Sequence, residues 1–476
     1  MREYVLQTDK SIRLAEAIRK VRPDFAMPCG GKGTCGKCAV LVKGDLAPID
    51  AEETALLEQT SKPEAPAGYC WRLACHADLL CSCSLMLDAP DEALTQLTSI
   101  KTPCAAAVDI GTTTVCYRIY DSKTRSLLFS DSVYSRQAGF GADVVSRIDY
   151  ANTHGVKPLT QAILRQLNEL IGSLPLDSMV ITGNTTMLHL FAGLPPKSLG
   201  VAPFTPVSLF GRLLPFKKTE AYLPACISTY VGADITCGIL ATELTKENKN
   251  RLLVDVGTNG EMALCADGRR LCCATAAGPA FEGAQISMGM PFKQGAIDKA
   301  EWANDRLHCR VIGNGPALGL CGTGLISVIF RLLEHDLIDE TGRLAIDPFP
   351  LGDSGVFISQ QDVRNVQLAK AAIRAGIETL LHEAALTYKD IDTLLLCGGF
   401  GASLNPHEAA GIGLIPLELA GKTVAAGNAA LEGAARLLFD SAAREEARQI
   451  AASFTEISLS SSPYFSERYI DEMMFE

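Results

Sequence analysis

The feature that most constrains the fold of this chain is a pair of matching segments that lie a domain's length apart. Residues 107–121 read AVDIGTTTVCYRIYD, and residues 253–267 read LVDVGTNGEMALCAD. Each predicts an apolar strand that carries an Asp, then a Gly–Thr turn, then a second apolar strand. The match gives Asp109 and Asp255 equivalent positions. It therefore predicts an internal repeat.

The chemistry of this turn indicates phosphate binding. An Asp-x-Gly-Thr turn between two strands offers one carboxylate together with consecutive backbone N–H and hydroxyl donors, and such a nest binds phosphate oxygens. The Asp can also hold Mg²⁺, directly or through water. One turn is a weak signal, but two equivalent turns can grip a triphosphate from both sides.

A cysteine-rich loop near the N-terminus indicates a second kind of site. The sequence CGGKGTCGKC, residues 29–38, supplies Cys29, Cys35 and Cys38, and Cys75 follows in WRLAC. A tight loop with one distant cysteine is the pattern that holds a [2Fe–2S] cluster, although the first gap here is five residues, not the four of the plant type. A zinc ribbon needs paired CxxC knuckles, and only one CxxC occurs here. The other cysteines of this region are expected to be core thiols: Cys70, Cys81 and Cys83.

The pattern of strands and helices divides the chain. From residue 105 onward, apolar strands alternate with longer helical stretches and glycine turns, which is typical of α/β proteins. The predicted parts are a cysteine-rich domain at 1–88, a linker at 89–104, a two-lobed domain at 105–440 with lobes of about 105–250 and 251–440, and a tail at 441–476.

Charge and composition exclude some classes of partner. The net charge is −11 and the pI is near 5.3, which argues against nucleic acid or an anionic membrane as a partner, because both attract basic surfaces. The sequence holds no run of 18 apolar residues and its first 21 residues lack an apolar signal core, so a cytoplasmic protein is expected. Seventeen cysteines then indicate metal ligands or buried thiols.

Five segments, in order, resemble the motifs of the actin/Hsp70/sugar-kinase ATPase superfamily. VDIGTTT (108–114) and VDVGTNGE (254–261) resemble its two phosphate turns, and LLLCGGFGASL (394–404) resembles its adenosine motif. Residues 367–381 and 424–438 resemble the two connecting helices that cross at the hinge. The resemblance implies a two-lobed ATPase domain with an RNase H-like repeat, here preceded by a β-grasp [2Fe–2S] ferredoxin domain.

Further segments resemble one family, the reductive activators of corrinoid proteins: GADVVSRI (141–148), TGNTTMLHLFAGL (182–194), LGVAPFTP (199–206), ATAAGPAFEGAQISMGM (274–290), GLCGTGLIS (319–327) and GGFGASLNP (398–406). The resemblance implies an ATP-hydrolysing enzyme that returns Co(II) of a corrinoid protein to Co(I) with one electron from its cluster, in support of methyl transfer. It also implies an upstream electron donor, namely a ferredoxin, a flavodoxin or a reductase. A homodimer is left open.

The resemblance assigns roles to particular residues. The cluster ligands are Cys29, Cys35, Cys38 and Cys75. The residues that contact Mg²⁺ and the phosphates from one lobe are Asp109, Gly111, Thr112 and Thr113. Those that contact them from the other lobe are Asp255, Gly257, Thr258, Asn259 and Gly260. The adenosine is framed by Gly398, Gly399 and Phe400. Either Asp255 or Glu282 orients the attacking water, and Asn184 is expected to cap a helix, not to bind a ligand.

Two departures from the family and three other functions stay open. The linker runs almost directly into the first phosphate turn, so the separate small middle domain of the family is expected to be missing, and the tail holds no cysteine. The first alternative is an ATP-dependent electron injector for a 2-hydroxyacyl-CoA dehydratase, although such activators lack a fused ferredoxin domain. The others are a redox-sensing nucleotide-binding regulator and a sugar kinase.

Overall fold

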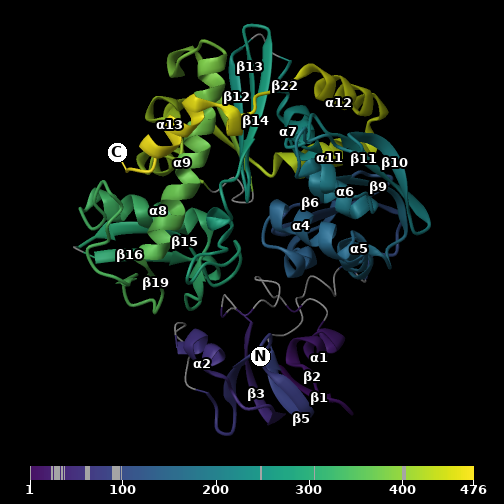
Figure 1. Ribbon diagram of the computed structural model, residues 1–476, viewed down its shortest axis with the longest axis vertical. Helices are drawn as coiled ribbons and strands as arrows, with labels where there is room; N and C mark the ends of the chain where they lie inside the picture. Colours follow the sequence, from purple (N-terminus) through teal and green to yellow (C-terminus); the bar gives the residue numbers. More distant parts are fainter. Residues whose placement is uncertain are drawn as a thin grey trace.

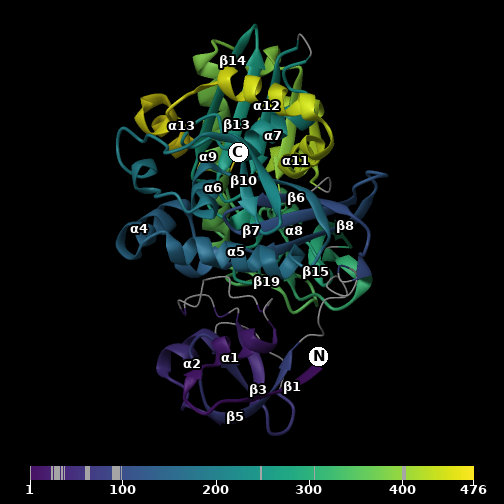
Figure 2. The same ribbon diagram turned by 90° about the vertical axis from the view of Figure 1, so that its right-hand side faces the viewer.

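The computed structural model describes the chain except residues 1, 23–24, 26–32, 34–35, 37, 59–64, 88–96, 98, 247–248, 305, 399–403 and 476. Two large sheets with their helices form two lobes side by side, and a smaller N-terminal sheet lies at the end of the molecule below them (Figure 1). The view turned by 90° shows the same separation of the N-terminal sheet from the lobes (Figure 2). No helix among the described residues is long and apolar enough to span a membrane.

The N-terminal sheet is antiparallel and has the order β1-β5-β3-β4, with β2 also paired to β5. Its strands are β1 (Arg2–Gln7), β2 (Ile12–Arg13), β3 (Ala39–Leu46), β4 (Cys70–Leu73) and β5 (Asp78–Leu87). Two helices accompany it, α1 (Leu14–Val21) and α2 (Ala51–Glu58). The buried face of α1 presents Leu14 and Ile18, one helical turn apart, to a core that also holds Leu79 and Leu85 of β5.

The first lobe is built on a six-stranded sheet of order β10-β11-β9-β6-β7-β8. Its strands are β6 (Cys104–Ile110), β7 (Thr114–Asp121), β8 (Leu127–Tyr134), β9 (Leu176–Thr182), β10 (Phe210–Phe216) and β11 (Thr219–Ala225). Its helices are α4 (Val144–His154), α5 (Lys157–Ile171), α6 (Thr185–Ala192) and α7 (Ala233–Thr242). Helix α5 buries residues spaced four apart, Leu159, Ile163, Leu167 and Ile171, against this sheet.

The second lobe is built on a six-stranded sheet of order β21-β20-β12-β13-β14-β22. Its strands are β12 (Arg251–Val256), β13 (Gly260–Ala266), β14 (Arg269–Thr275), β20 (Thr393–Gly398), β21 (Thr423–Gly427) and β22 (Thr455–Glu456). Smaller sheets are made by β15 (Ala296–Ala303), β16 (Arg306–Val311) and β17 (Gly319–Leu320), and by β18 (Phe349–Pro350) and β19 (Phe357–Ile358). Its helices include α8 (Gly322–Glu334), α9 (Gln360–Glu383), α10 (Pro406–Gly411), α11 (Ala429–Phe439), α12 (Ser441–Ser453) and α13 (Pro463–Asp471).

The two large sheets share one topology. The run β8-β7-β6-β9-β11 of the first sheet has the same order as β14-β13-β12-β20-β21 of the second. In both, the first three strands are antiparallel neighbours and the last two continue in parallel. Strands β6 and β12 are therefore equivalent, and so are Asp109 and Asp255. The internal repeat predicted from the sequence is confirmed.

The predicted pair of connecting helices is only half right. Helix α11 lies between the two sheets, but its partner there is α7, and their buried residues share one core with Ala105 of β6 and Leu253 of β12. Helix α9, which contains residues 367–381, covers the other face of the second sheet, where Ile373 packs with Val254. The prediction failed because alternate residues of β12 face opposite sides, and the sequence of α9 does not say which side it covers.

Residues 441–476, predicted as a tail, pack against both lobes, because α12 lies against α7 and β11 of the first lobe. Strand β22 extends the sheet of the second lobe by pairing in parallel with β14, and α13 packs against α9. Phe475 near the end of the chain is only 2% exposed. At the other boundary, Leu97 of the predicted linker is buried in the core of the first lobe.

Candidate functional site

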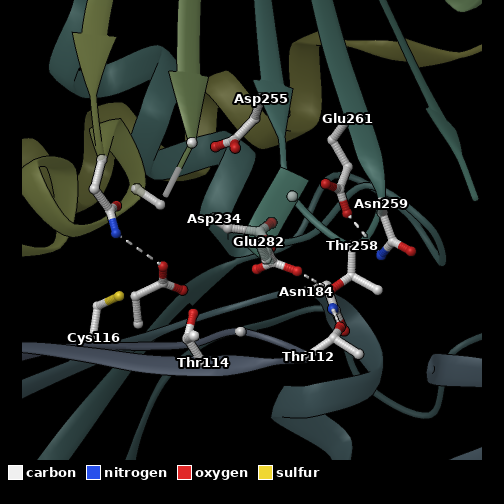
Figure 3. A pocket seen from close by; sticks show the side chains of 16 residues that line it. Thr112, Thr114, Cys116, Asn184, Asp234, Asp255, Thr258, Asn259, Glu261 and Glu282 are labelled. Atoms are coloured by element: carbon white, nitrogen blue, oxygen red, sulfur yellow. Dashed lines mark hydrogen bonds between the residues drawn. The ribbon is translucent and has the colours of Figure 1, made fainter. Parts of the chain in front are cut away.

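A cleft of about 600 Å³, open solvent included, lies where the two equivalent turns face each other (Figure 3). The first turn joins β6 to β7 and the second joins β12 to β13. The cleft is lined by Asp109, Gly111, Thr112, Thr114, Cys116, Asn184, Asp234, Asp255, Gly257, Thr258, Asn259, Glu261, Glu282, Gly398, Asn428 and Ala430. Both lobes thus contribute to one site.

The first turn is shaped by close backbone packing. A Cβ atom at Gly111 would lie 2.7 Å from the backbone oxygen of Thr114, so only glycine fits there. Asp109, on the strand before the turn, accepts a hydrogen bond of 3.5 Å from Nδ2 of Asn428. Asn184 donates from Nδ2 to Oγ1 of Thr112 at 3.1 Å. The hydroxyl of Thr112 and the carboxylate of Asp109 are therefore held by the asparagines at the starts of α6 and α11.

The second turn is closed by its own backbone. The N–H of Gly257 donates to the carbonyl oxygen of Asn259 at 2.9 Å. Asp255 lies opposite Glu261 in the β12–β13 ladder, and Nδ2 of Asn259 donates to Oε1 of Glu261 at 3.2 Å. The second turn therefore brings two carboxylates to the cleft, where the first brings one.

The two turns touch through their threonine hydroxyls. Oγ1 of Thr113 and Oγ1 of Thr258 are 2.7 Å apart, and both side chains are buried. Thr258 also donates to Oε2 of Glu282 at 2.5 Å. A charge-assisted hydrogen bond of this length is strong. Glu282 is therefore fixed at the junction of the two lobes.

Burial and mutual repulsion raise the pKa values of the carboxyl groups in the cleft. Burial, opposed by a hydrogen bond from Asn428 and reinforced by Glu282, raises the pKa of Asp109 to about 6. Burial, Asp234, Asp109 and Glu282 raise the pKa of Asp255 to about 8. Burial and nearby acids also raise the pKa of Asp234 and of Glu261. A nearby cation would let these carboxylates ionise, but among the described residues no three of them are grouped so as to hold a metal ion by themselves.

Most of the predicted nucleotide-binding residues lie together in the cleft. Those that line it are Asp109, Gly111, Thr112, Asp255, Gly257, Thr258, Asn259, Glu282 and Gly398. Thr113 lies beside them through its bond to Thr258. Gly260 does not line the cleft but packs against α9, because a Cβ atom there would lie 2.9 Å from Cγ1 of Ile373. Gly399 and Phe400 lie outside the described residues.

Sequence reasoning missed several residues that line the cleft. Asn184 caps α6 by accepting from the N–H of Met187 at 2.9 Å, as predicted, but its amide nitrogen also reaches the first turn. Asn428 does the same for α11, accepting from the N–H of Leu431 at 2.8 Å while it donates to Asp109. The signal was a Gly–Asn pair between strand and helix, in TGNTT and AGNAA. Asp234, in the first turn of α7, was also missed.

The predicted cluster ligands fall partly within the described residues. Sγ of Cys38 and Sγ of Cys75 are 3.1 Å apart, and the N–H of Cys75 donates to Sγ of Cys38 at 3.4 Å. Cys29 and Cys35 lie outside the described residues. In the part of the chain that is described, no three His, Cys, Asp or Glu side chains are grouped so as to hold a metal ion.

The expectation of core thiols at the three other cysteines of this region is wrong for two of them. Cys83 is buried, but Cys70 and Cys81 are exposed. Cys81 lies on β5 where the regular alternation is interrupted, because Leu80 and Cys81 are exposed in succession, opposite an irregularity in the pairing with β3 between Gly44 and Leu46. The sequence run LLCSCSLML does not reveal which of its cysteines faces outward.

Comparisons with known proteins identify the relatives of this chain. Residues 249–476 match the family model described as the C-terminal domain of RACo, the ASKHA domain, and residues 104–247 match the RACo middle region. The expectation that a middle domain is missing is therefore not supported: the residues interpreted as the first lobe match the middle region of the family.

Two curated proteins and one solved structure are similar over most of the chain. "Corrinoid activation enzyme RamQ" of Eubacterium limosum is 34% identical, over 78% of this chain and 70% of that protein. "[Co(II) methylated amine-specific corrinoid protein] reductase" of Methanosarcina barkeri is 26% identical, over 78% and 76%. The structure of a "Reductive activator for corrinoid, iron-sulfur protein" is 27% identical with a TM-score of 0.75, over 97% of this chain and 95% of that one.

Proposed function

Because the chain belongs to the family of corrinoid-activating proteins, we propose that it reductively activates a corrinoid protein of a methyl-transfer system. In this proposal the chain uses ATP to return one electron to an oxidised cobalt, so that Co(II) becomes Co(I). The observation that carries it is the likeness to a solved reductive activator along nearly the whole chain, N-terminal sheet included, with a TM-score of 0.75.

The N-terminal sheet is proposed to be a β-grasp ferredoxin domain that holds a [2Fe–2S] cluster. The ligands would be Cys29, Cys35, Cys38 and Cys75, and the fit is supported by two thiols from separate segments that approach to 3.1 Å. Such a cluster, when bound, supplies one electron at a time. His76 follows Cys75, and its ring packs over Gly33 of the cysteine loop, where a Cβ atom would lie 2.2 Å from Nε2. This contact would fix the loop against the turn that carries Cys75.

The cleft between the lobes is proposed to bind ATP with Mg²⁺. Asp109 and Asp255 would face the cation, since they occupy equivalent positions on the two lobes and both are half-buried near other acids. Donors to the phosphates would come from Thr112 and Thr113 on one side and Gly257, Thr258 and Asn259 on the other. Gly398, with Gly399 and Phe400, would frame the adenosine. Carboxylates alone would repel a triphosphate, so the cation is necessary for binding.

Glu282 is proposed to orient the attacking water. Its Oε2 accepts from Thr258 at 2.5 Å. Burial raises the pKa of Glu282, while hydrogen bonds from Thr258 and Thr113 and the charge of Arg147 oppose that shift. Among the described residues, no positively charged side chain offsets the shift at Asp255, and its pKa is raised to about 8. Asp255 is therefore better suited to bind Mg²⁺ than to orient the water. Phosphoryl transfer depends mainly on positioning and on charge stabilisation, and a carboxyl group fixed in this way would supply the positioning.

The two lobes are proposed to couple nucleotide to electron transfer by moving about the helices between the sheets, α7 and α11. A conformational bias of a factor of about 10⁴, roughly 5.5 kcal/mol, corresponds to about 240 mV for a single electron. A nucleotide that closes the cleft could therefore make an unfavourable reduction of cobalt proceed, provided that closure is linked to binding of the corrinoid protein.

The test is a spectrophotometric assay on the intact protein. A Co(II) corrinoid protein of a methyltransferase system is mixed with a chemical reductant, Mg-ATP and this chain, and the absorbance of Co(I) is followed. We expect Co(I) to accumulate only in the presence of the chain. A chain that binds ATP but forms no Co(I) would be a nucleotide-binding regulator, and the proposal would be wrong.

A further inference from the structure

Arg147 is a fully buried cation that lies behind the first turn of the cleft. It belongs to α4, its side chain is 0% exposed, and it is the bulkiest of the fully buried side chains. Within the described part of the chain, no carboxylate forms a salt bridge with it. Burying a guanidinium without an ion pair is costly, so its position requires strong compensating contacts.

Those contacts go to the backbone around the first turn. Nη2 of Arg147 donates to the carbonyl oxygen of Thr112 at 2.5 Å, and Nε donates to the carbonyl oxygen of Gly141 at 2.9 Å. Nη1 is 3.0 Å from Sδ of Met187, on α6. The planar guanidinium therefore ties the turn to two other segments of the first lobe, which a lysine ammonium on a longer flexible stem cannot reproduce with the same geometry.

Arg147 also acts electrostatically on the cleft, although it does not line it. Its charge lowers the pKa of Glu282 against the effect of burial. In turn, burial lowers the pKa of Arg147 to about 10, while the charges of Asp143 and Glu282 oppose that shift. At neutral pH Arg147 is charged, and it lies behind a cleft whose ionisable lining residues are five carboxylic acids and Cys116.

We propose that Arg147 is a positioning residue for ATP hydrolysis, which holds the backbone of Thr112 in place and provides the cleft with a positive charge without touching the nucleotide. This inference rests on the proposed function of the cleft. Because Arg147 acts through Thr112 and Glu282, its loss should affect the rate of hydrolysis more than the affinity for nucleotide. A small displacement of positioning groups is enough to slow a reaction by about 100-fold.

The test compares Arg147→Met and Arg147→Lys with the wild-type chain and with Arg374→Met. Arg374 is a suitable control because it is also buried, in α9, and lies outside the cleft. Turnover is measured by phosphate release at saturating Mg-ATP, and the dissociation constant by titration with Mg-ADP. For Arg147→Met we expect turnover to fall by about 100-fold and the dissociation constant to change by less than about 5-fold. Arg147→Lys should recover part of the turnover, since it restores the charge alone.

Each outcome decides the question. Wild-type turnover in a folded Arg147→Met or Arg147→Lys chain overturns the inference, and so does an equal loss in Arg374→Met at the same folded fraction. If neither Arg147 variant folds, the residue is structural and the inference is also wrong. A wild-type chain that binds no Mg-ATP would instead refute the proposed function of the cleft, and it is recognised before any variant is made.

Discussion

Thr113 and Thr258, one from each of the two equivalent turns, share a hydrogen bond of 2.7 Å across the junction of the two lobes. Each belongs to its own copy of the internal repeat, so the contact joins equivalent parts of two sheets. Thr258 also donates a hydrogen bond to Glu282. The lobes are thus already in contact at the point where a nucleotide would have to bind.

Removing one hydroxyl of this pair should loosen the nucleotide-free protein. Thr113→Val keeps the shape of the side chain but deletes the bond to Thr258, and we expect the free energy of unfolding to fall by about 1 kcal/mol. Chemical denaturation monitored by circular dichroism measures it. Thr379→Val is a control for buried threonines, because its hydroxyl donates to the carbonyl of Ala375 within α9, away from the cleft. Because the hydroxyl of Thr113 is also proposed to donate to the phosphates, saturating Mg-ATP should widen the difference in stability between wild type and Thr113→Val. A difference that nucleotide leaves unchanged would contradict that role.

Glu282→Gln should separate binding from hydrolysis. The amide keeps the size of the side chain but cannot carry the negative charge that polarises a water, so we expect turnover to fall by about 100-fold or more. The affinity for Mg-ATP should change little, because Glu282 is not proposed to hold the cation. Phosphate release and equilibrium titration measure the two quantities. Near-normal turnover in this variant would direct attention to Asp255 instead.

The stability of the nucleotide-free chain should depend on Asp255. Burial raises its pKa from 3.8 to about 8, so between about pH 5 and 7 the folded chain keeps a proton that the unfolded chain has lost. Stability therefore falls as pH rises through this window, by about 1.4 kcal/mol per pH unit for one such proton. Asp255→Asn should remove that part of the slope and be more stable than wild type at pH 7. The free energy of unfolding of both proteins is measured by urea titration at pH 5, 6 and 7. If it changes with pH equally in wild type and in Asp255→Asn, Asp255 is ionised in the folded chain.

The predicted cluster ligands can be separated from the other cysteines of the N-terminal domain. Cys38→Ser and Cys75→Ser should each lose the visible absorption and the electron paramagnetic resonance signal of a reduced two-iron cluster, since each removes a thiolate ligand. Cys81→Ser is the matched control, because Cys81 is exposed on β5 and is not a predicted ligand. Loss of the signal in the control, or its survival in Cys75→Ser, would change the ligand assignment.

The repeat and the cleft could be predicted because their signals are local. The strand, the Asp, the Gly–Thr turn and the next strand follow one another in sequence, so the pattern around Asp109 and Asp255 is visible without knowing the fold. Asn184 was also correctly expected to cap a helix for the same reason.

Features that depend on long-range packing could not be predicted in this way. Helices α7 and α9 both contain many apolar residues, and only the pairing of the strands decides which of them lies between the sheets. In the sequence, Arg147 is one charged residue of an amphipathic helix. Its proposed role depends on its contact with Thr112, which lies 35 residues earlier in the chain. The second function of Asn428, its contact with Asp109, joins residues 319 positions apart.

The central claim is that nucleotide in the cleft drives reduction of cobalt in a partner protein. The most direct measurement is the initial rate of Co(I) formation on a Co(II) corrinoid protein, with the chain and a fixed concentration of reductant, in the presence of Mg-ATP and in its absence. We predict rapid formation of Co(I) with Mg-ATP, little without it, and little with Glu282→Gln under the same conditions. Equal rates with and without nucleotide would contradict the account.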